Sequence, residues 1–208
     1  MKKSILFLLS ILISSATFAQ VSFGLKAGYN AASVKSNDAE ITDDGQTLSG
    51  FHIGSVVNVP FNKKVSFQTG LNLGTKGVNV AHQGHGDKYK FTAIDIPLNV
   101  VVTSKKGLFA GTGLNLGYNL SGKLDAHDDP TENYDFEFGS DKNFTRADLG
   151  LNFLIGYQTK SGIFVSANSL VSLTDIAPSA TSWKNNVISL SVGYTLKSSK
   201  KYGGSRKF

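Results

Sequence analysis

The sequence predicts an all-β protein: an eight-stranded, antiparallel up-and-down transmembrane β-barrel of the small outer-membrane type. Three observations predict it. Eight segments alternate apolar and polar residues, the links between them are in turn long and short, and the chain starts with a segment typical of exported proteins. An even strand number lets such a sheet close and removes its unpaired edges.

The first 19 residues have the three parts of a cleaved signal peptide. Lys2 and Lys3 form a basic start, Ile5–Ile13 an apolar centre, and Ala16–Ala19 places small residues where a signal peptidase cleaves. The apolar run is too short to cross a membrane as a helix. We therefore expect residues 1–19 to be removed, residues 20–197 to form the barrel in the cell outer membrane, and residues 198–208 to be a basic tail.

Composition limits the alternatives. The chain has 208 residues, no cysteine and a formal net charge of +6, with the positive charge spread over turns and the tail. This charge is too diffuse for a nucleic-acid footprint, so no nucleic-acid partner is expected. After the leader there is no second apolar stretch of about 18 residues, so any membrane crossing must use strands.

The first four strands alternate apolar and polar residues, and the first of them does so throughout. Strand four carries Pro97 at its centre, which predicts a bulge or a locally unpaired site because proline has no N–H. These strands are expected at Val21–Val34, at Phe51–Val59, from Val65 to Gly74 with continuation toward Val80, and at Tyr89–Thr103; they are separated by a polar stretch Lys35–Ser49, a turn Pro60–Lys64 and a loop Ala81–Asp87.

The last four strands follow the turn Ser104–Gly107. They are expected at Leu108–Leu120, Asp148–Gln158, Ile163–Leu173 and Val187–Lys197, joined by a long acidic loop Gly122–Thr145, a turn Thr159–Gly162 and a loop Thr174–Lys184. In the acidic loop Tyr134, Phe136 and Phe138 alternate, which favours strand structure beyond the membrane. Val187–Lys197 should pair antiparallel with Val21–Ala31 and close the sheet.

The apolar face could point to lipid or, as in a soluble lipocalin-like barrel, inward. Glycines on the opposite face favour lipid, since a narrow lumen explains them and a solvent-exposed face does not. They are at positions 24, 28, 54, 70, 74, 111, 113, 117, 150, 156 and 193, and tyrosines 29, 118, 157 and 194 lie near strand ends as an aromatic girdle requires.

Four motifs resemble the PorT-like outer-membrane β-barrel proteins of Bacteroidota, members of the porin-family barrel proteins. They are Phe23–Asn30, Gln68–Gly77, Ile94–Leu98 and Asp148–Asn152, the third matching a hydrophobic-acid-hydrophobic-Pro-Leu pattern. The resemblance covers nearly all of the chain that follows residue 19. It implies an eight-stranded barrel that the barrel assembly machinery inserts into the outer membrane. The named member of the PorT-like family serves a secretion system.

Four ionisable residues fall on the predicted inner face: Lys26, Lys76, Asp95 and Asp148. An eight-stranded lumen is about wide enough for side chains to fill it, and a buried charge needs a partner. We therefore expect a polar network that pairs Lys26 or Lys76 with Asp95 or Asp148 and plugs the lumen. The alternative interpretation is a gated polar channel or a ligand site.

Metal and catalytic sites are not expected. The histidines of His82–Asp87 and the acids of Gly122–Thr145 could hold zinc or calcium, but flexible polar loops explain both. A lipid-modifying enzyme would need a nucleophile beside a histidine on the lipid face, whereas His52 points inward and no G-x-S-x-G motif occurs. The sequence thus predicts no enzyme and no cofactor.

The expected function is a structural or interaction role through the long outer loops, in a monomer surrounded by outer-membrane lipid. Two alternatives are an accessory subunit of an envelope secretion or transport complex, with envelope proteins as partners, and a narrow small-solute channel, which the small strand number disfavours.

Overall fold

A computed structural model describes residues 21–37, 39–82, 85–126, 133–139, 142, 144–177 and 182–196. The expected signal peptide, residues 1–19, and the expected tail, residues 198–208, lie outside this part of the chain. The elements are β1 (Ser22–Ser36), α2 (Ala39–Asp44), β2 (Gly45–Pro60), β3 (Val65–Thr69), β4 (Asn72–His82), β5 (His85–Thr103), β6 (Leu108–Asp125), β7 (Tyr134–Asp135), β8 (Ala147–Gln158), β9 (Ile163–Ser172) and β10 (Trp183–Leu196).

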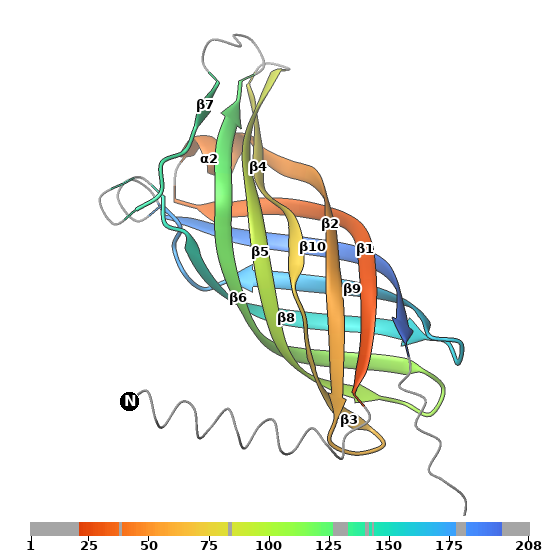
Figure 1. The fold of residues 1–208 in the computed structure, drawn as a ribbon. Coiled ribbons are helices and arrows are strands. Elements are labelled where there is room, and N and C mark those ends of the chain that lie inside the picture. The colour runs from red at the N-terminus through yellow and green to blue at the C-terminus, as the bar shows by residue number, and fades with distance from the viewer. Residues whose placement is uncertain are drawn as a thin grey trace, which may run out of the picture.

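The strands form one closed antiparallel sheet, seen from the side in Figure 1. β1 pairs with β2, β5 with β6, β6 with β8, β8 with β9 and β9 with β10, while β3 and β4 both lie between β2 and β5; β1 also pairs with β10, which closes the barrel. Ten strands make eight staves, because β3 and β4 follow one another in a single stave between β2 and β5, and the two-residue β7 only adds to the edge of β6. The predicted fold class is confirmed.

The closing pair has the predicted partners. Phe23 lies opposite Leu196 and Ala31 opposite Ile188, so β1 and β10 run antiparallel in one register over their whole contact. This register sets the inner face of β1 beside that of β10, because side chains of directly opposite residues share a face.

The break between β3 and β4 lies opposite Pro97. Gln68 pairs with Asn99 and Asn72 with Asp95, so the same register would set Gly70 opposite Pro97. Proline cannot donate a ladder hydrogen bond, and pairing with that side is interrupted there. Pro97 does pair in register with Asn115 of β6 on its other side. The prediction of a locally unpaired site is therefore confirmed on one side of the strand only.

Several predicted boundaries were wrong at the end of the barrel that carries the long loops. β2 begins at Gly45 and α2 precedes it, where a polar stretch to Ser49 was predicted; β6 extends to Asp125, and β10 begins at Trp183. The predicted loop Ala81–Asp87 is mostly strand, since β4 ends at His82 and β5 begins at His85. At this end the strands extend beyond the apolar band, so backbone pairing continues where the alternation of apolar and polar residues has stopped.

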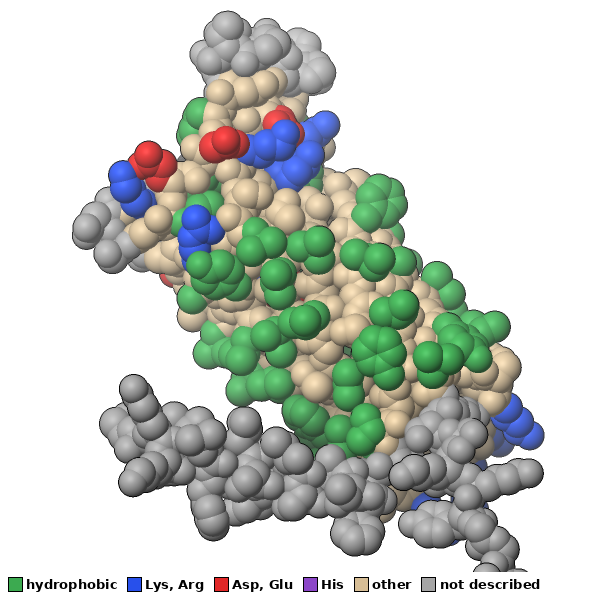
Figure 2. Space-filling view, viewed as in Figure 1, with side chains coloured by type: hydrophobic (Ala, Val, Ile, Leu, Met, Phe, Trp, Pro, Cys, Tyr) green, Lys and Arg blue, Asp and Glu red, His purple; other side chains and the backbone are tan. Residues whose placement is uncertain are grey.

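The apolar face of the strands points outward. Figure 2 shows apolar side chains over the middle of the barrel wall and charged ones toward its ends. Phe51 is 75% exposed, and tyrosines 29, 118, 157 and 194 are all exposed on this face. The structure thus has the orientation of a membrane barrel rather than of a lipocalin. No helix among the described residues is long and apolar enough to cross a membrane.

Glycines on the inner face leave room for larger neighbours. A Cβ on Gly117 would lie 3.0 Å from both Asp95 Oδ1 and the Cβ of Asp148, and one on Gly193 would meet the ring of Phe164. At these positions the lumen is therefore filled by side chains from neighbouring strands, as the sequence predicted from these glycines.

Candidate functional site

The lumen contains a buried group of three charges, here called the ion cluster: Lys76 of β4, Asp95 of β5 and Asp148 of β8. The Lys76 ammonium donates to Asp95 Oδ1 at 2.7 Å and to Asp148 Oδ2 at 3.1 Å. Because β4 and β8 are separated by β5 and β6, the contact between Lys76 and Asp148 crosses the lumen. Lys76 is 2% exposed, so the cluster is a cross-brace inside the barrel.

Neutral side chains complete the hydrogen bonding of the two carboxylates. Asn115 of β6 donates to Asp95 Oδ1 at 2.6 Å. Asn185 of β10 donates to Asp148 Oδ2 at 3.3 Å, and the Thr174 hydroxyl donates to Asp148 Oδ1 at 3.4 Å. Buried charges are tolerated where pairing and hydrogen bonds replace water, and here β4, β5, β6, β8 and β10 all contribute.

Lys26 of β1 does not join the ion cluster. It lies within electrostatic range of Asp95, but it makes no hydrogen bond or ion pair with any residue that the structure describes. The structure therefore brings together three of the four ionisable residues singled out in the sequence. With both carboxylates ionised, the charge of Lys26 balances the net negative charge of the other three.

A second polar group surrounds His52 of β2. Its Nδ1 lies 2.7 Å from Asn30 Oδ1 and its Nε2 lies 2.9 Å from Ser191 Oγ, while the Ser189 hydroxyl donates to Asn30 Oδ1 at 2.8 Å. Since an amide oxygen only accepts, the hydrogen of a neutral imidazole belongs on Nδ1, and Nε2 accepts from Ser191.

This order of contacts is that of a serine, histidine and amide triad, in which the base activates the hydroxyl. All three side chains are buried. His52 and Asn30 line a cavity of about 50 Å³, far below the several hundred Å³ of a usual ligand pocket. Ser191 does not line this cavity, and the group forms a hydrogen-bonded link between β1, β2 and β10.

The end of the barrel with the short turns is hollow. A cavity of about 200 Å³, here called the turn-end vestibule, is bordered by the β2–β3 turn with Lys63 and Lys64 and reaches inward to Lys26 and Asn168. Lys26 and Asn168 also line the smaller cavity around His52, so they stand between the vestibule and the middle of the lumen. Polar space thus extends from the short turns up to the ion cluster.

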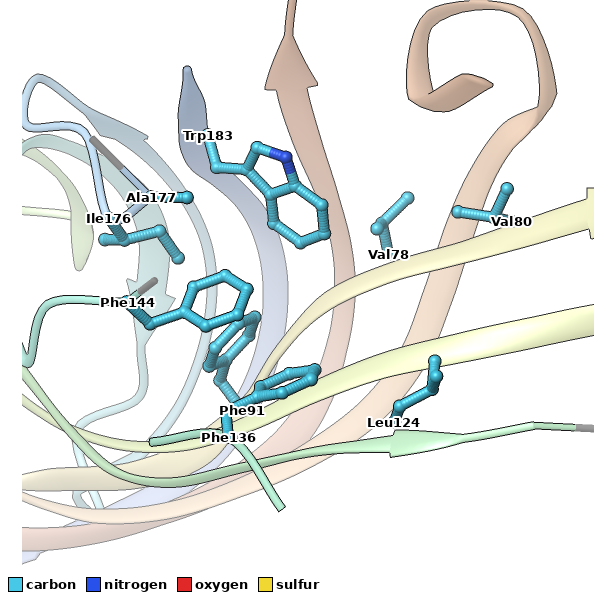
Figure 3. Packing of buried hydrophobic residues seen from close by; sticks show 9 residues of the cluster. All are labelled: Val78, Val80, Phe91, Leu124, Phe136, Phe144, Ile176, Ala177 and Trp183. Atoms are coloured by element: carbon cyan, nitrogen blue, oxygen red, sulfur yellow. The ribbon is translucent and has the colours of Figure 1, made fainter. Parts of the chain in front are cut away.

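The opposite end is closed by apolar side chains, here called the loop-end cap (Figure 3). The cap joins the strand ends of β4, β5, β6 and β10 to residues of two long connections. Phe136 and Phe144 pack at 4.6 Å between ring centroids, and Phe144 lies 5.6 Å from Trp183. The buried members are Val78, Val80, Phe91, Leu124, Phe136, Phe144, Ile176, Ala177 and Trp183.

Backbone hydrogen bonds hold the two connections of the cap together. The N–H of Thr145 donates to the carbonyl oxygen of Ile176 at 2.8 Å, and the N–H of Ile176 donates to that of Trp183 at 2.9 Å. The Arg146 guanidinium donates to the carbonyl oxygen of Leu120 at 2.7 Å and lies 4.6 Å from the centre of the Phe138 ring. The connection from β6 to β8 is therefore folded onto the barrel mouth.

Asp175 stabilises the second connection of the cap. Its Oδ1 accepts from the N–H groups of Ala177 at 2.9 Å and Trp183 at 2.8 Å. Partial burial opposes ionisation, but these backbone donors outweigh it, and the pKa of the Asp175 carboxyl lies below its ordinary value. The carboxylate is thus the form that suits the folded connection.

No metal site is evident in the part of the chain that the structure describes, where no group of three histidine, cysteine or acidic residues comes together. His82 and His85 are opposite one another in the backbone register of β4 and β5. Asp128, Asp129, Glu132 and Asp141 of the acidic loop lie outside the described residues.

Sequence reasoning missed the cap and the contacts of His52. Trp183 stood in a predicted loop, yet it is buried at the start of β10. The alternation of Tyr134, Phe136 and Phe138 was a usable signal, but its reason is the burial of Phe136 in the cap rather than a long strand.

Together, the closed sheet, the outward apolar band and the side-chain-filled lumen define a small β-barrel of the outer-membrane class. The sequence matches the family of the outer membrane protein beta-barrel domain over residues 17–177, which is most of the chain. The protein belongs to this family.

Solved structures of similar shape are outer-membrane barrels with low sequence identity. Ail of Yersinia pestis, solved with the heparin analogue sucrose octasulfate, is 13% identical, with 85% of this chain and 99% of that chain covered and a TM-score of 0.51. Neisserial surface protein A is 14% identical with coverages of 83% and 96% and a TM-score of 0.49. OprG of Pseudomonas aeruginosa is 14% identical with coverages of 86% and 97% and a TM-score of 0.48.

The similarity to Ail supports the fold alone. Among curated proteins, no sequence matches this one.

Proposed function

We propose that this outer-membrane barrel is a closed, non-enzymatic protein that acts through the surface built on its long loops. The observation that carries the proposal is the loop-end cap, in which two connections are packed onto the barrel mouth by buried aromatic side chains. Long loops face the outside in barrels of this class, and short turns face the periplasm. A folded cap holds the neighbouring exposed residues in fixed positions, as a binding surface requires.

The same arrangement argues against a solute channel. A solute would have to pass the loop-end cap and then the ion cluster, where Lys76 bridges carboxylates across the lumen. Separating these charges from one another costs several kcal/mol unless water replaces every contact. Transport would therefore require unfolding of the cap as well as breakage of the cross-brace.

Planar bilayer recordings test whether the barrel is closed. We expect purified wild-type protein to give no steady conductance steps, because both barriers are in place. A variant with Phe136→Ala and Phe144→Ala should open only the cap, and one with Lys76→Met only the cross-brace, so neither should conduct steadily alone. Regular steps from the wild-type protein would contradict the proposal.

The interaction role is tested by mild crosslinking in native membranes. Tyr134 is 56% exposed beside the cap, whereas Phe51 is exposed on the lipid-facing wall. We expect Tyr134→Ala to weaken a specific crosslinked product, and Phe51→Ala, the matched control, to leave it unchanged. An equal loss for both variants, or a protein that crosslinks to nothing, would refute an interaction through the loop end.

A second candidate is an accessory subunit of an envelope secretion or transport complex. The resemblance of motifs such as Ile94–Leu98 and Asp148–Asn152 to those of PorT-like barrels supports it. Both stretches contribute to the ion cluster, so the shared motifs also suit a common way of bracing the lumen. Copurification of secretion or transport subunits under gentle solubilisation would favour this candidate, and a loop-end crosslinked product that contains no such subunit would favour the first.

A further inference from the structure

The short turns of the barrel are rich in positively charged residues. The three short turns, residues 61–64, 104–107 and 159–162, contain five lysines and no acidic residue: Lys63, Lys64, Lys105, Lys106 and Lys160. The long-loop end carries acidic residues as well: Lys90 and Lys123 pair with Asp125, and Lys142 pairs with Glu137. Like charges around one opening add their potentials and attract anions toward it.

The turn-end vestibule continues this positive charge into the lumen. The described residues that line it include Lys26, Lys63 and Lys64 but no aspartate or glutamate. Its volume is about 200 Å³, whereas one water needs about 10–15 Å³, so it has room for a small anion. The vestibule is thus a cationic hollow that opens between the short turns.

Lys26 supplies the charge at the inner end of this hollow. An ammonium has three N–H donors, and none of them meets an acceptor among the described residues. Asp95, the carboxylate that attracts it, already accepts from Lys76 and Asn115. A partly buried cation in this position is stabilised by water or by an anion that enters the hollow.

The wall beside Lys26 offers further hydrogen-bonding groups. Ser166 and Asn168 of β9 and Thr195 of β10 line the same vestibule from neighbouring strands. Their hydroxyl and amide groups can donate to an oxyanion that the ammonium attracts. Phe109 and Phe164 form an apolar part of the wall, which restricts access of bulk water to one side.

We propose that the turn-end vestibule binds a small soluble oxyanion, a carboxylate or phosphate compound of the periplasm, with Lys26 as its principal ligand. The site is separate from the loop end and does not depend on the role proposed there. A phospholipid headgroup carries the same phosphate chemistry, so the source of the anion must be part of the test.

Inorganic phosphate is the probe, titrated at constant ionic strength into the protein in a maltoside detergent, which contains no phosphate. Amide NMR shifts are followed. We expect saturable shifts at Ser166, Asn168 and Thr195. Lys26→Met should weaken binding about tenfold or more, the effect of losing a charge-assisted hydrogen bond, and Lys26→Arg should retain binding because it keeps the cation.

Lys105→Gln is the matched control, because Lys105 is a turn lysine that does not border the vestibule. It should change affinity by less than about twofold, since only screened, long-range attraction is lost. Unchanged amide shifts of β4 and β5 in the Lys26→Met protein show that its barrel is folded. Shifts that do not saturate in maltoside, or equal affinity in wild-type and Lys26→Met protein, would overturn the proposal.

Discussion

Replacing Lys76 by methionine tests the cross-brace of the lumen. Its ammonium lies between Asp95 and Asp148, so its removal leaves two carboxylates within about 6 Å of each other, close enough to repel strongly. Methionine fills much of the same volume, so the loss of charge is the main change. Removing one partner of a buried ion pair typically costs about 3–5 kcal/mol, and we expect a loss of unfolding free energy in this range.

The assay is urea unfolding of the barrel in lipid vesicles, followed by far-ultraviolet circular dichroism and by tryptophan fluorescence. Trp183 is the single tryptophan of the chain and is buried in the loop-end cap, so its emission reports on the cap. With a denaturant slope of about 2 kcal/mol per molar, the expected loss lowers the midpoint by about 2 M.

Lys90→Met is the control for this experiment. Lys90 pairs with Asp125 at 3.4 Å, and both side chains are about one-third exposed. Such a pair contributes about 0–1 kcal/mol, so its loss should hardly move the midpoint. If Lys76→Met unfolds at the same urea concentration as Lys90→Met, the lumen charges do not brace the barrel.

Three further perturbations test other parts of the structure. Phe136→Ala should lower the unfolding free energy by about 3–5 kcal/mol and shift the tryptophan emission to the red. Tyr134→Ala at the exposed rim should lower it by less than about 0.5 kcal/mol in the same unfolding assay. Gly28→Ala would place a methyl group against the Leu190 carbonyl oxygen and the His52 imidazole, so it should lower the unfolding free energy by about 1–3 kcal/mol. Gly139→Ala would contact only the flexible Lys142 side chain, so it should leave the unfolding free energy unchanged. The pKa of the Asp175 carboxyl is lower in the folded protein than the unfolded value of about 3.9, so the ionised carboxylate stabilises the cap above that pH. This stabilisation is lost as the pH falls through the lower folded pKa. Fluorescence should therefore show the cap loosening below about pH 4, and Asp175→Asn should remove that pH dependence.

The barrel could be predicted because its pattern is local. In β10 every second residue is apolar and exposed, as at Ile188, Leu190 and Val192. This alternation defines a strand with one face toward lipid. The pairing of β1 with β10 then follows from closure. Pro97 gave a further local signal, since a missing N–H interrupts pairing whatever surrounds it.

The contacts of the lumen and the cap depend on features that alternation does not contain. Parity assigns Lys76 and Asp148 to an inner face, but only the shear of the closed sheet decides which inner residues meet across it. Lys26 has the same parity and lies nearer the short turns, away from the ion cluster. For Phe144 and Trp183 no period applies, because each lies outside the apolar band and is buried by another connection.

The loop-end cap has a consequence for how the protein reaches its final state. Val78 and Trp183, both buried in the cap, are more than a hundred residues apart in the chain, and the segments that carry them are joined to strands that must first cross the membrane. Contacts between such distant residues form late, because the entropy cost of closing a large loop comes before the favourable energy of the contacts. Burial of the tryptophan is therefore an internal signal of completed insertion: during refolding into vesicles its emission change should lag the gain of strand structure.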